Sequence, residues 1–317
     1  MPTTKTKKKV TAKPKTRTLK DKSKVVKKVV KKVEPTKVAK IVVEMKDLQK
    51  NVVPKKIDLS VIIVSLNTKD LTKQTIDSAL IAMENIGGEI IVVDNNSNDG
   101  SIEMIQKYGS KVKLVENRRN LGFGSANDRG AKHAKGKYLM FLNSDTIVPK
   151  NTFSEIIKFL DQNEEVGLLS PKLVNNDKDH SLQLGSFGKF STPWRILFRS
   201  SRKQPPLNSK GSFTKVDWVS GAAMVIRHNL FTELKGFDEN IFLYFEDEDL
   251  CRRANYYDFD TVVLNNAEIV HLNGQSTNSK KRTNYYDQSQ DYFIDKYFGV
   301  IWAFIIHIMR IPYRLMK

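Results

Sequence analysis

Residues 59–66, LSVIIVSL, decide the fold of this chain. They form a continuous apolar run rich in β-branched side chains, which is typical of a parallel strand buried on both faces of a sheet. A helical pattern over 70–83 follows, and a second apolar run, EIIVVD, occupies 89–94. The first third of the folded part therefore begins with a strand, a helix and a strand.

This alternation continues along the chain. We expect a helix near 101–108, a strand at 111–116, a helix ending near 135 and a strand at 137–143 (KYLMFLN). Strands that alternate with helices at this spacing predict an α/β fold, a doubly wound and mostly parallel sheet flanked by helices. Further on, the sequence predicts helices at 151–162, after 229 and up to 257, with strands at 166–170, 261–264 and 268–271.

Polar side chains stand where each predicted strand ends. Asn67 closes the first strand, Asp94 the second, residues 117–120 the third, and residues 143–145 the fourth. In doubly wound sheets ligands bind beyond the carboxyl ends of the strands, so we expect these side chains to line one crevice. The polar segment 175–215 interrupts the pattern and predicts a lid, an acceptor-binding loop or a mobile insertion.

Charge is distributed unevenly along the 317 residues, whose formal net charge is +18. Residues 1–56 hold 20 Lys and Arg against four Asp and Glu, so the remainder is close to neutral. This Lys-rich arm lacks aromatic residues and is expected to be disordered, with a folded domain over 57–275 and a helical C-terminal segment over 276–317. Valines at helical spacing between 25 and 33 also allow a basic amphipathic helix on an anionic membrane surface.

Several features bear on the cellular location. Cys251 is the only cysteine, which excludes an intramolecular disulfide and fits a reducing compartment. No signal peptide is apparent, and no segment reaches the roughly 20 apolar residues of a spanning helix, so we expect a cytoplasmic protein. The apolar run at 299–317 favours an amphipathic helix on the inner face of the cytoplasmic membrane or a homodimer interface, with an ordinary core helix as the alternative. Nucleic acid is a poor partner for an arm without aromatic residues.

Six stretches, in this order, resemble the inverting family-2 glycosyltransferases of the GT-A fold, in the branch that includes bacterial rhamnosyltransferases. The resemblance covers about 59–271. The stretches are VIIVSLN (61–67), IIVVDNNSNDGS (90–101), NRRNLGFGSAND (117–128), YLMFLNSDT (138–146), VSGAAMVIRHNLF (219–231) and GFDENIFLYFEDEDLCRR (236–253).

The resemblance implies a nucleotide site built on the first three strands. Asp94 would accept a hydrogen bond from the imide N–H of uracil or thymine, and Gly122 and Gly124 would let backbone N–H groups approach phosphate. A dinucleotide-binding dehydrogenase is a weak alternative, because Asn127 stands where a third glycine would fall. The other expected donor contacts, several of which also suit turns and helix caps, are Asn67, Asn95, Asp99, Asn127, Asn143 and Ser144.

The resemblance also implies a divalent cation, Mg²⁺ or Mn²⁺, on the diphosphate. Asp145 occupies the last position of the family's Asp-x-Asp metal motif, and His271 matches a histidine that completes the metal site in relatives. Asn143 departs from the motif because it offers a neutral carbonyl oxygen in place of a carboxylate. A structural hydrogen bond is the alternative role of His271.

For the acceptor, residues 246–249 form a block of four carboxylates whose mutual repulsion should raise some of their pKa values. The block also suits a helix N-terminus, where Glu248 and Asp249 would support the helix while Asp247 acts as general base. The expected acceptor-binding residues are Trp218, Gly221, Ala222, Glu246, Arg252 and Arg253, of which Trp218 would stack on a sugar or lie in the core.

Taken with the resemblance, these residues predict an inverting transferase. It would move a sugar, L-rhamnose from dTDP-rhamnose being our choice, from a dTDP- or UDP-sugar to a lipid-linked or polysaccharide acceptor by a single displacement. The alternative is a non-catalytic nucleotide-sugar or glycan-binding scaffold of the same fold, which Asn143 at the metal motif favours.

Overall fold

The computed structural model describes residues 56–198, 204–272 and 279–315. The predicted arm therefore lies outside the described residues, apart from Lys56. The described residues from Lys56 onward fall in one compact unit, and the domain boundaries expected from the sequence stay predictions.

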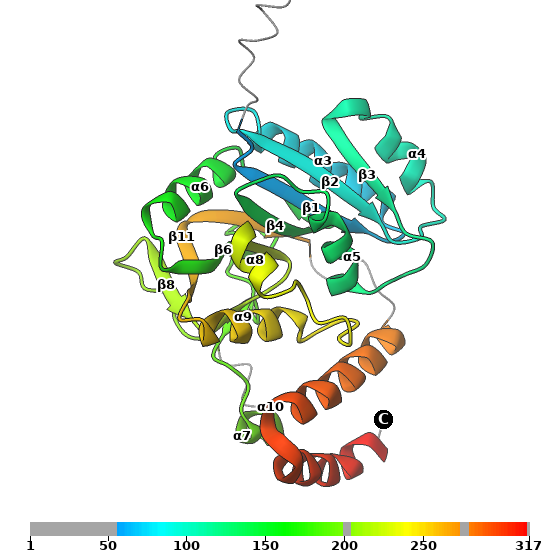
Figure 1. Cartoon of the computed structure of the whole chain (residues 1–317), viewed down its shortest axis with the longest axis vertical. Helices are drawn as coiled ribbons and strands as arrows, with labels where there is room; N and C mark the ends of the chain where they lie inside the picture. Colours follow the sequence, from blue (N-terminus) through cyan, green and yellow to red (C-terminus); the bar gives the residue numbers. More distant parts are fainter. Residues whose placement is uncertain (1–55, 199–203, 273–278, 316–317) are drawn as a thin grey trace, which may run out of the picture. The chain divides into compact units, whose positions relative to one another are not determined.

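A large sheet organises this unit (Figure 1), with strand order β3-β2-β1-β4-β10-β6-β11-β5 and β8 paired to β11. The four strands predicted first are all parallel to one another, and β10 then runs antiparallel between β4 and β6. The strands are β1 (Leu59–Ser65), β2 (Gly88–Asp94), β3 (Val112–Glu116), β4 (Tyr138–Asn143), β5 (Thr146–Ile147), β6 (Val166–Val174), β8 (Phe213–Val216), β10 (Ala223–Arg227) and β11 (Asp260–His271), with β7 (Phe187–Gly188) and β9 (Trp218–Val219) as a separate pair.

Helices cover both faces of the sheet, as a doubly wound fold requires. One face packs against α3, α4 and α6, and the other against α5, α8 and α9. This arrangement confirms the predicted α/β fold. The helices are α3 (Lys69–Ala82), α4 (Ser101–Gln106), α5 (Phe123–Ala131), α6 (Thr152–Gln162), α7 (Pro193–Leu197), α8 (His228–Glu233), α9 (Glu246–Tyr256) and α10 (Ser279–Leu315), with the short 3₁₀ helix η1 (Gly109–Lys111).

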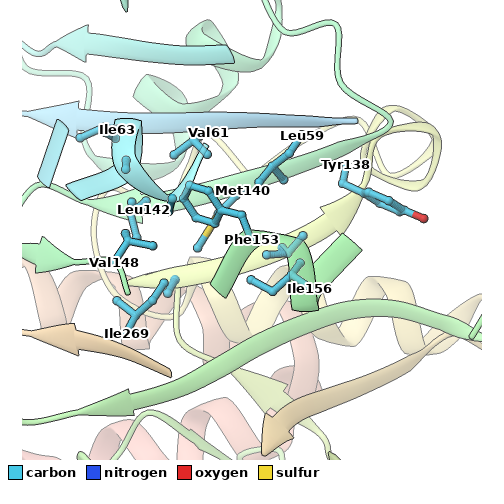
Figure 2. Packing of buried hydrophobic residues seen from close by; sticks show 14 of the residues in the cluster. Leu59, Val61, Ile63, Tyr138, Met140, Leu142, Val148, Phe153, Ile156 and Ile269 are labelled. Carbon is cyan, nitrogen blue, oxygen red and sulfur yellow. The ribbon is translucent and has the colours of Figure 1, made fainter. Parts of the chain in front are cut away.

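The alternation of side chains along β1 explains why nearly all of its sequence is apolar. Leu59, Val61 and Ile63 point to the face covered by α6, where they pack with Phe153 (Figure 2). Ile62 points to the opposite face and joins the second apolar cluster. All five side chains are fully buried, so both faces of this strand contribute to the hydrophobic stabilisation.

Two parts of the sequence fold differently from our expectation. The two strands expected at 261–264 and 268–271 are one strand, β11, with a shift of register between Leu264 and Glu268. The segment 175–215, where described, holds β7, α7 and the start of β8, and it begins with a turn in which Asn175 N–H donates to Ser181. It is therefore tied to the sheet on both sides, and its short elements escaped prediction because they lack periodicity.

The C-terminal helix α10 is longer than the apolar run that predicted it. Non-helical backbone at Gly299 (φ 73°, ψ 168°) divides it into two helices that meet at an angle (Figure 1). By length and composition alone, the stretch Thr283–Ile311 meets the criteria for a membrane-spanning helix, and 22% of its apolar window is buried. The break at Gly299 divides this stretch into two shorter helices. The expectation that no segment is long enough was wrong on these criteria, because the helix begins well before the apolar run.

Candidate active site

Strand register brings the predicted donor-side residues to one edge of the sheet. Asp94 pairs with Ser65 at the end of β1, and Asn143 pairs with Val64 one residue earlier. The carboxyl ends of β2, β1 and β4 are thus neighbours, and the crevice rule for parallel sheets applies to this edge. Asp145 lies two residues after Asn143, in the turn beyond the end of β4.

Asp94 has one carboxylate oxygen free for a ligand. Its Oδ2 accepts hydrogen bonds from the backbone N–H groups of Asn96 (3.1 Å) and Ser97 (2.9 Å). Its Oδ1 is buried and has no hydrogen-bond partner among the described residues. A buried acceptor without a partner is costly, so an N–H donor from a bound base would satisfy an existing need.

Other residues expected to contact the nucleotide make hydrogen bonds that join the loops of the site to one another. Asn95 Oδ1 accepts hydrogen bonds from Asn117 Nδ2 and the Leu121 N–H, and Asn95 Nδ2 donates to Asn120 Oδ1. This network ties the loop after β2 to the loop after β3. Asn67 Oδ1 accepts from the Asn98 N–H, and Asp99 accepts from the N–H groups of Lys69 and Ser101. Ligand contacts by Asn67, Asn95 and Asp99 stay predictions, whereas their roles in turns and caps are visible.

Gly122 and Gly124, at the start of α5, make room for other parts of the chain, and their contact with phosphate stays a prediction. A Cβ on Gly122 (φ 83°) would lie 2.3 Å from the carbonyl oxygen of Phe242, which accepts the Phe123 N–H. A Cβ on Gly124 would lie 2.8 Å from Cβ of Phe237. The Phe123 N–H is therefore already used, and these glycines allow residues 237–242 to cross the start of α5. Asn127 keeps a buried Oδ1 without a partner among the described residues.

Asp145 and His271 come together although 126 residues separate them. His271 Nε2 lies 3.1 Å from Asp145 Oδ1, and Asn143 Nδ2 lies 3.3 Å from the same ring nitrogen. The Leu272 N–H donates to the Asp145 carbonyl, which fixes the end of β11 against the loop after β4. The Ser144 hydroxyl accepts a hydrogen bond from Thr68 in the same region. Both Asp145 and His271 are largely buried, with side-chain exposures of 3% and 11%.

This pair fits a divalent cation in part. Adjacent ligands of an octahedral ion at about 2.1 Å lie about 3.0 Å apart, close to the observed separation of Asp145 Oδ1 and His271 Nε2. Within the described ranges, no group of three or more His, Cys, Asp and Glu side chains could hold a metal. A cation here would therefore need oxygens from the diphosphate, and Asn143 could add a carbonyl oxygen after rotation of its amide.

Gln183 is a neighbour of this pair that the sequence did not reveal. Its Oε1 lies 2.9 Å from Nδ1 of His271, on the far side of the ring from Asp145. The residue lies in the segment 175–215, where no motif distinguishes it from the surrounding polar residues.

Backbone hydrogen bonds join this part of the site to the predicted base. The Asn143 N–H donates to the carbonyl of Ala222, and the Gly221 N–H donates to Asp247 Oδ2 (3.2 Å). Asp247 Oδ1 accepts from the Glu248 N–H (2.8 Å). Gly221 also lies against the Phe123 ring, with its would-be Cβ 2.9 Å away. The end of β4, the loop before β10 and the start of α9 are thus joined, and Asp145, His271 and Asp247 belong to this joined structure.

Burial makes Asp247 a weaker acid than an exposed aspartate. Loss of hydration raises its pKa to about 6, while the two backbone donors partly oppose this shift. Burial, with repulsion from Asp247, raises the pKa of Glu246 well above its usual range. Glu246 Oε2 is buried without a hydrogen-bond partner among the described residues, which favours its protonated form. Near neutral pH, the charge of this pair therefore resides mainly on Asp247.

The remaining carboxylates of the block face away from Asp247. Glu248 accepts hydrogen bonds from the Ser191 N–H and hydroxyl and pairs with Arg252, while Asp249 pairs with Arg253 and accepts from Tyr297. These contacts agree with the prediction that Glu248 and Asp249 support the helix.

Three residues expected at the acceptor have other partners. Each of Arg252 and Arg253 pairs with the carboxylate four residues earlier on α9. The Trp218 indole N–H donates to the carbonyl of Lys189, and its ring packs against the second apolar cluster. Contacts of these three side chains with an acceptor stay predictions.

Known proteins share this architecture. Staphylococcus aureus TarS 1–349, solved in complex with UDP, has a TM-score of 0.50 at 18% identity, covering 75% of this chain and 72% of that one. A mannosyltransferase from Pyrobaculum calidifontis, solved with GDP-Man and Mn²⁺, has a TM-score of 0.52 at 16% identity, covering 76% and 63%. At these identities the likeness shows the fold alone, which is GT-A-like.

Two relatives have higher sequence identity to this chain than these structures do. Rhamnosyltransferase WbbL of Escherichia coli K12 is 28% identical over 206 residues, covering 62% of this chain and 76% of that protein. The N-acetylglucosaminyl-diphospho-decaprenol L-rhamnosyltransferase of Mycobacterium tuberculosis H37Rv is 25% identical over 216 residues, covering 59% and 67%. The family model described as "Glycosyl transferase family 2" matches residues 60–233, more than half of the chain. This protein belongs to glycosyl transferase family 2.

Proposed function

We propose that this chain is an inverting glycosyltransferase that moves L-rhamnose from dTDP-rhamnose to a glycan acceptor carried on a lipid diphosphate or a growing polysaccharide. Two relatives named as rhamnosyltransferases, one of them as an L-rhamnosyltransferase, support this choice of sugar at 25–28% identity. The free Oδ1 of Asp94 supports a pyrimidine nucleotide, because the imide of thymine or uracil carries the N–H that this oxygen lacks.

The observation that carries the proposal is the position of Asp247. Its carboxylate is held by the Gly221 and Glu248 N–H groups beside the loop that bonds to Asn143. Asp247 would accept the proton of the acceptor hydroxyl as the oxygen attacks the anomeric carbon. The bond from that carbon to the diphosphate breaks at the same time, and its electron pair leaves with the diphosphate. A base with a pKa near the working pH serves this role well.

A divalent cation, Mg²⁺ or Mn²⁺, would be held by Asp145 and His271, with Asn143 beside them. Its role would be to neutralise charge on the departing diphosphate. Asp145 would contribute the protein's negative charge to this position, since Asn143 is neutral.

Turnover assays on the purified chain test this proposal. A thermal-shift panel of UDP-, dTDP- and GDP-sugars with Mn²⁺ identifies the donor, because a ligand that binds only the folded state raises the melting temperature. With that donor, Asp247→Asn should lower transfer by at least about 10²-fold. Asp179→Asn, at an exposed position, should leave transfer unchanged. Full activity of Asp247→Asn would remove Asp247 as base, and absence of turnover in the unaltered chain would favour the scaffold alternative.

We also propose that the protein works on the cytoplasmic face of a membrane through a second surface, here called the apolar face. Exposed apolar side chains of α7, of the residue after it and of α10 beyond Gly299 form it. The ring centroids of Trp194 on α7 and Trp302 on α10 are 5.4 Å apart. In the sequence, three basic residues follow Phe198, and such residues suit anionic lipid; Arg199, Arg202 and Lys203 lie outside the described residues. The residues of the apolar face are Trp194, Phe198, Val300, Ile301, Phe304, Ile308, Met309 and Ile311.

A further inference from the structure

We propose that Gln183 is a positioning residue that fixes the proton of His271 on Nδ1, so that Nε2 directs a lone pair to the cation position beside Asp145. The inference rests on the proposed function, because it gives Gln183 a role toward the cation of the reaction. In the interactions described above, Gln183 contacts His271 and backbone groups, and no contact with either substrate is assigned to it.

The backbone around Gln183 is held firmly enough for such a role. Its N–H donates to the Leu173 carbonyl (2.8 Å), and its own carbonyl accepts from the Ser186 hydroxyl (2.8 Å). A bridge between Val174 and Leu182 closes the turn that precedes it. The residue is only 7% exposed. These bonds to the end of β6 therefore hold Gln183 where its side-chain amide reaches Nδ1 of His271.

The atoms that face the ring define its tautomer. In this orientation of the amide, Gln183 Oε1 lies 2.9 Å from Nδ1 and can only accept, so Nδ1 carries the proton, while Gln183 Nε2 is buried without a partner among the described residues. In the neutral ring, Nε2 is then an acceptor. Asn143 Nδ2, which can only donate, lies 3.3 Å from Nε2 and agrees with this assignment.

The same tautomer leaves an electrostatic conflict that a cation resolves. The Nε2 lone pair and the carboxylate oxygen Asp145 Oδ1 lie 3.1 Å apart with no proton between them. Two electron-rich atoms at this distance repel one another unless a positive charge lies close to both. Histidines that bind metals commonly donate their other N–H to a carbonyl or carboxylate oxygen, which orients the ring and raises the basicity of the ligand.

Rotation of the Gln183 amide would produce the opposite arrangement. Gln183 Nε2 would then donate to Nδ1, and the ring would donate its Nε2–H to Asp145 as an ordinary structural hydrogen bond. In that arrangement His271 has no lone pair for a cation. The two arrangements predict different behaviour of the same variants, so experiment can separate them.

The first test reads the tautomer directly, without acceptor and with Mg²⁺ and UDP present, because a cation removes the repulsion between Nε2 and Asp145. In ¹⁵N-histidine-labelled full chain, two-dimensional NMR at pH 8 should show His271 with a protonated Nδ1 and an unprotonated Nε2. A His271→Asn sample identifies the resonances. Gln183→Leu should shift the ring toward a mixture of tautomers. An Nε2–H ring in the unaltered protein would overturn the inference, whatever the outcome for catalysis.

The second test measures Mn²⁺ affinity in the presence of UDP and, separately, dTDP, from the electron paramagnetic resonance signal of free Mn²⁺. Gln183→Leu should weaken binding by about 10–100-fold. Gln183→Glu, which keeps the acceptor and nearly the shape, should bind Mn²⁺ at least as tightly as the unaltered chain. Unchanged affinity in Gln183→Leu would overturn the inference. If the unaltered chain binds no Mn²⁺ with either nucleotide, the proposed cation site fails, while the NMR result still decides the tautomer.

Discussion

Asp247 Oδ2 accepts the backbone N–H of Gly221 at 3.2 Å, although 26 residues separate the two in sequence. This bond joins the start of α9 to the loop between β9 and β10, and the next residue of that loop, Ala222, bonds to Asn143 at the end of β4. The candidate base and the candidate cation position are therefore parts of one hydrogen-bonded structure. A shift of the loop would move both.

The rate of transfer should depend on the ionisation of Asp247. Burial raises the pKa of this carboxyl to about 6, and only the ionised form can accept a proton. We therefore expect kcat/KM to rise with pH through about 6 and then to level off. Initial rates between pH 5 and 8 at saturating Mn²⁺ measure this, with a pH-independent coupling assay as control. A flat profile over the same range would contradict the assignment.

Asp247→Asn should make the protein more stable above pH 6. The pKa of Asp247 is raised in the folded state, so its contribution to stability is complete below the unfolded value near 4 and is lost as pH rises through 6. Asn carries no charge, and at pH 8 we expect a gain of about 1–2 kcal/mol after the loss of one acceptor oxygen. Urea unfolding at pH 4 and pH 8 checks this. A gain of equal size at both values would point to another cause.

Asp94→Asn should weaken nucleotide binding with little effect on folding. Asn can still accept the Asn96 and Ser97 N–H groups with its oxygen, but it then presents an NH₂ group where Oδ1 is free. Two donors would face each other at a pyrimidine imide, so we expect affinity for UDP or dTDP to fall by about 10-fold or more. Isothermal titration calorimetry measures this. Equal affinity in the variant would show that the base binds elsewhere.

Gly122→Ala should destabilise the protein far more than Gly109→Ala. Both glycines have positive φ, but a Cβ at 122 meets the Phe242 carbonyl at 2.3 Å, whereas a Cβ at 109 meets nothing within 4 Å. We expect losses of at least about 3 kcal/mol at Gly122 and about 1–2 kcal/mol at Gly109. Urea midpoints of the two variants provide the comparison. Similar midpoints would mean that residues 237–242 can move away from α5.

Charges on the apolar face should release the protein from membranes. Phe304→Glu with Ile308→Glu replaces two exposed side chains of α10, and Ile81→Glu, at a 50% exposed position on α3, is the matched control. We expect the double variant to lose flotation with phosphatidylglycerol vesicles while the control keeps it. Flotation of the unaltered chain should weaken with salt. Unchanged flotation of the double variant would show that the apolar face does not bind the membrane. A dimer of the unaltered chain that dissociates only in the double variant would show that the apolar face binds a second copy of the chain.

The strand and helix pattern of the first half could be read from the sequence because local rules determine it. Residues 61–64 and 90–93 are apolar at every position, which is typical of strands buried on two faces. The polar residue that ends each strand follows from the same pattern, since parallel strands place those ends at one edge. Periodicity did not predict α7 and β7, because these elements are too short to show it. It also did not predict the N-terminal half of α10, where charged residues interrupt the apolar pattern.

By itself, the sequence determined the α/β fold, its mostly parallel sheet and the residue types available for chemistry. Only the tertiary structure decided what each polar residue faces. It assigned Asn95 to the loops, filled the space at Gly122 with Phe242, and paired two carboxylates of the acidic block with arginines. It also brought Gln183 to His271 across 88 residues. Strand patterns reflect burial near each residue, whereas hydrogen bonds between distant loops depend on where the whole chain places them.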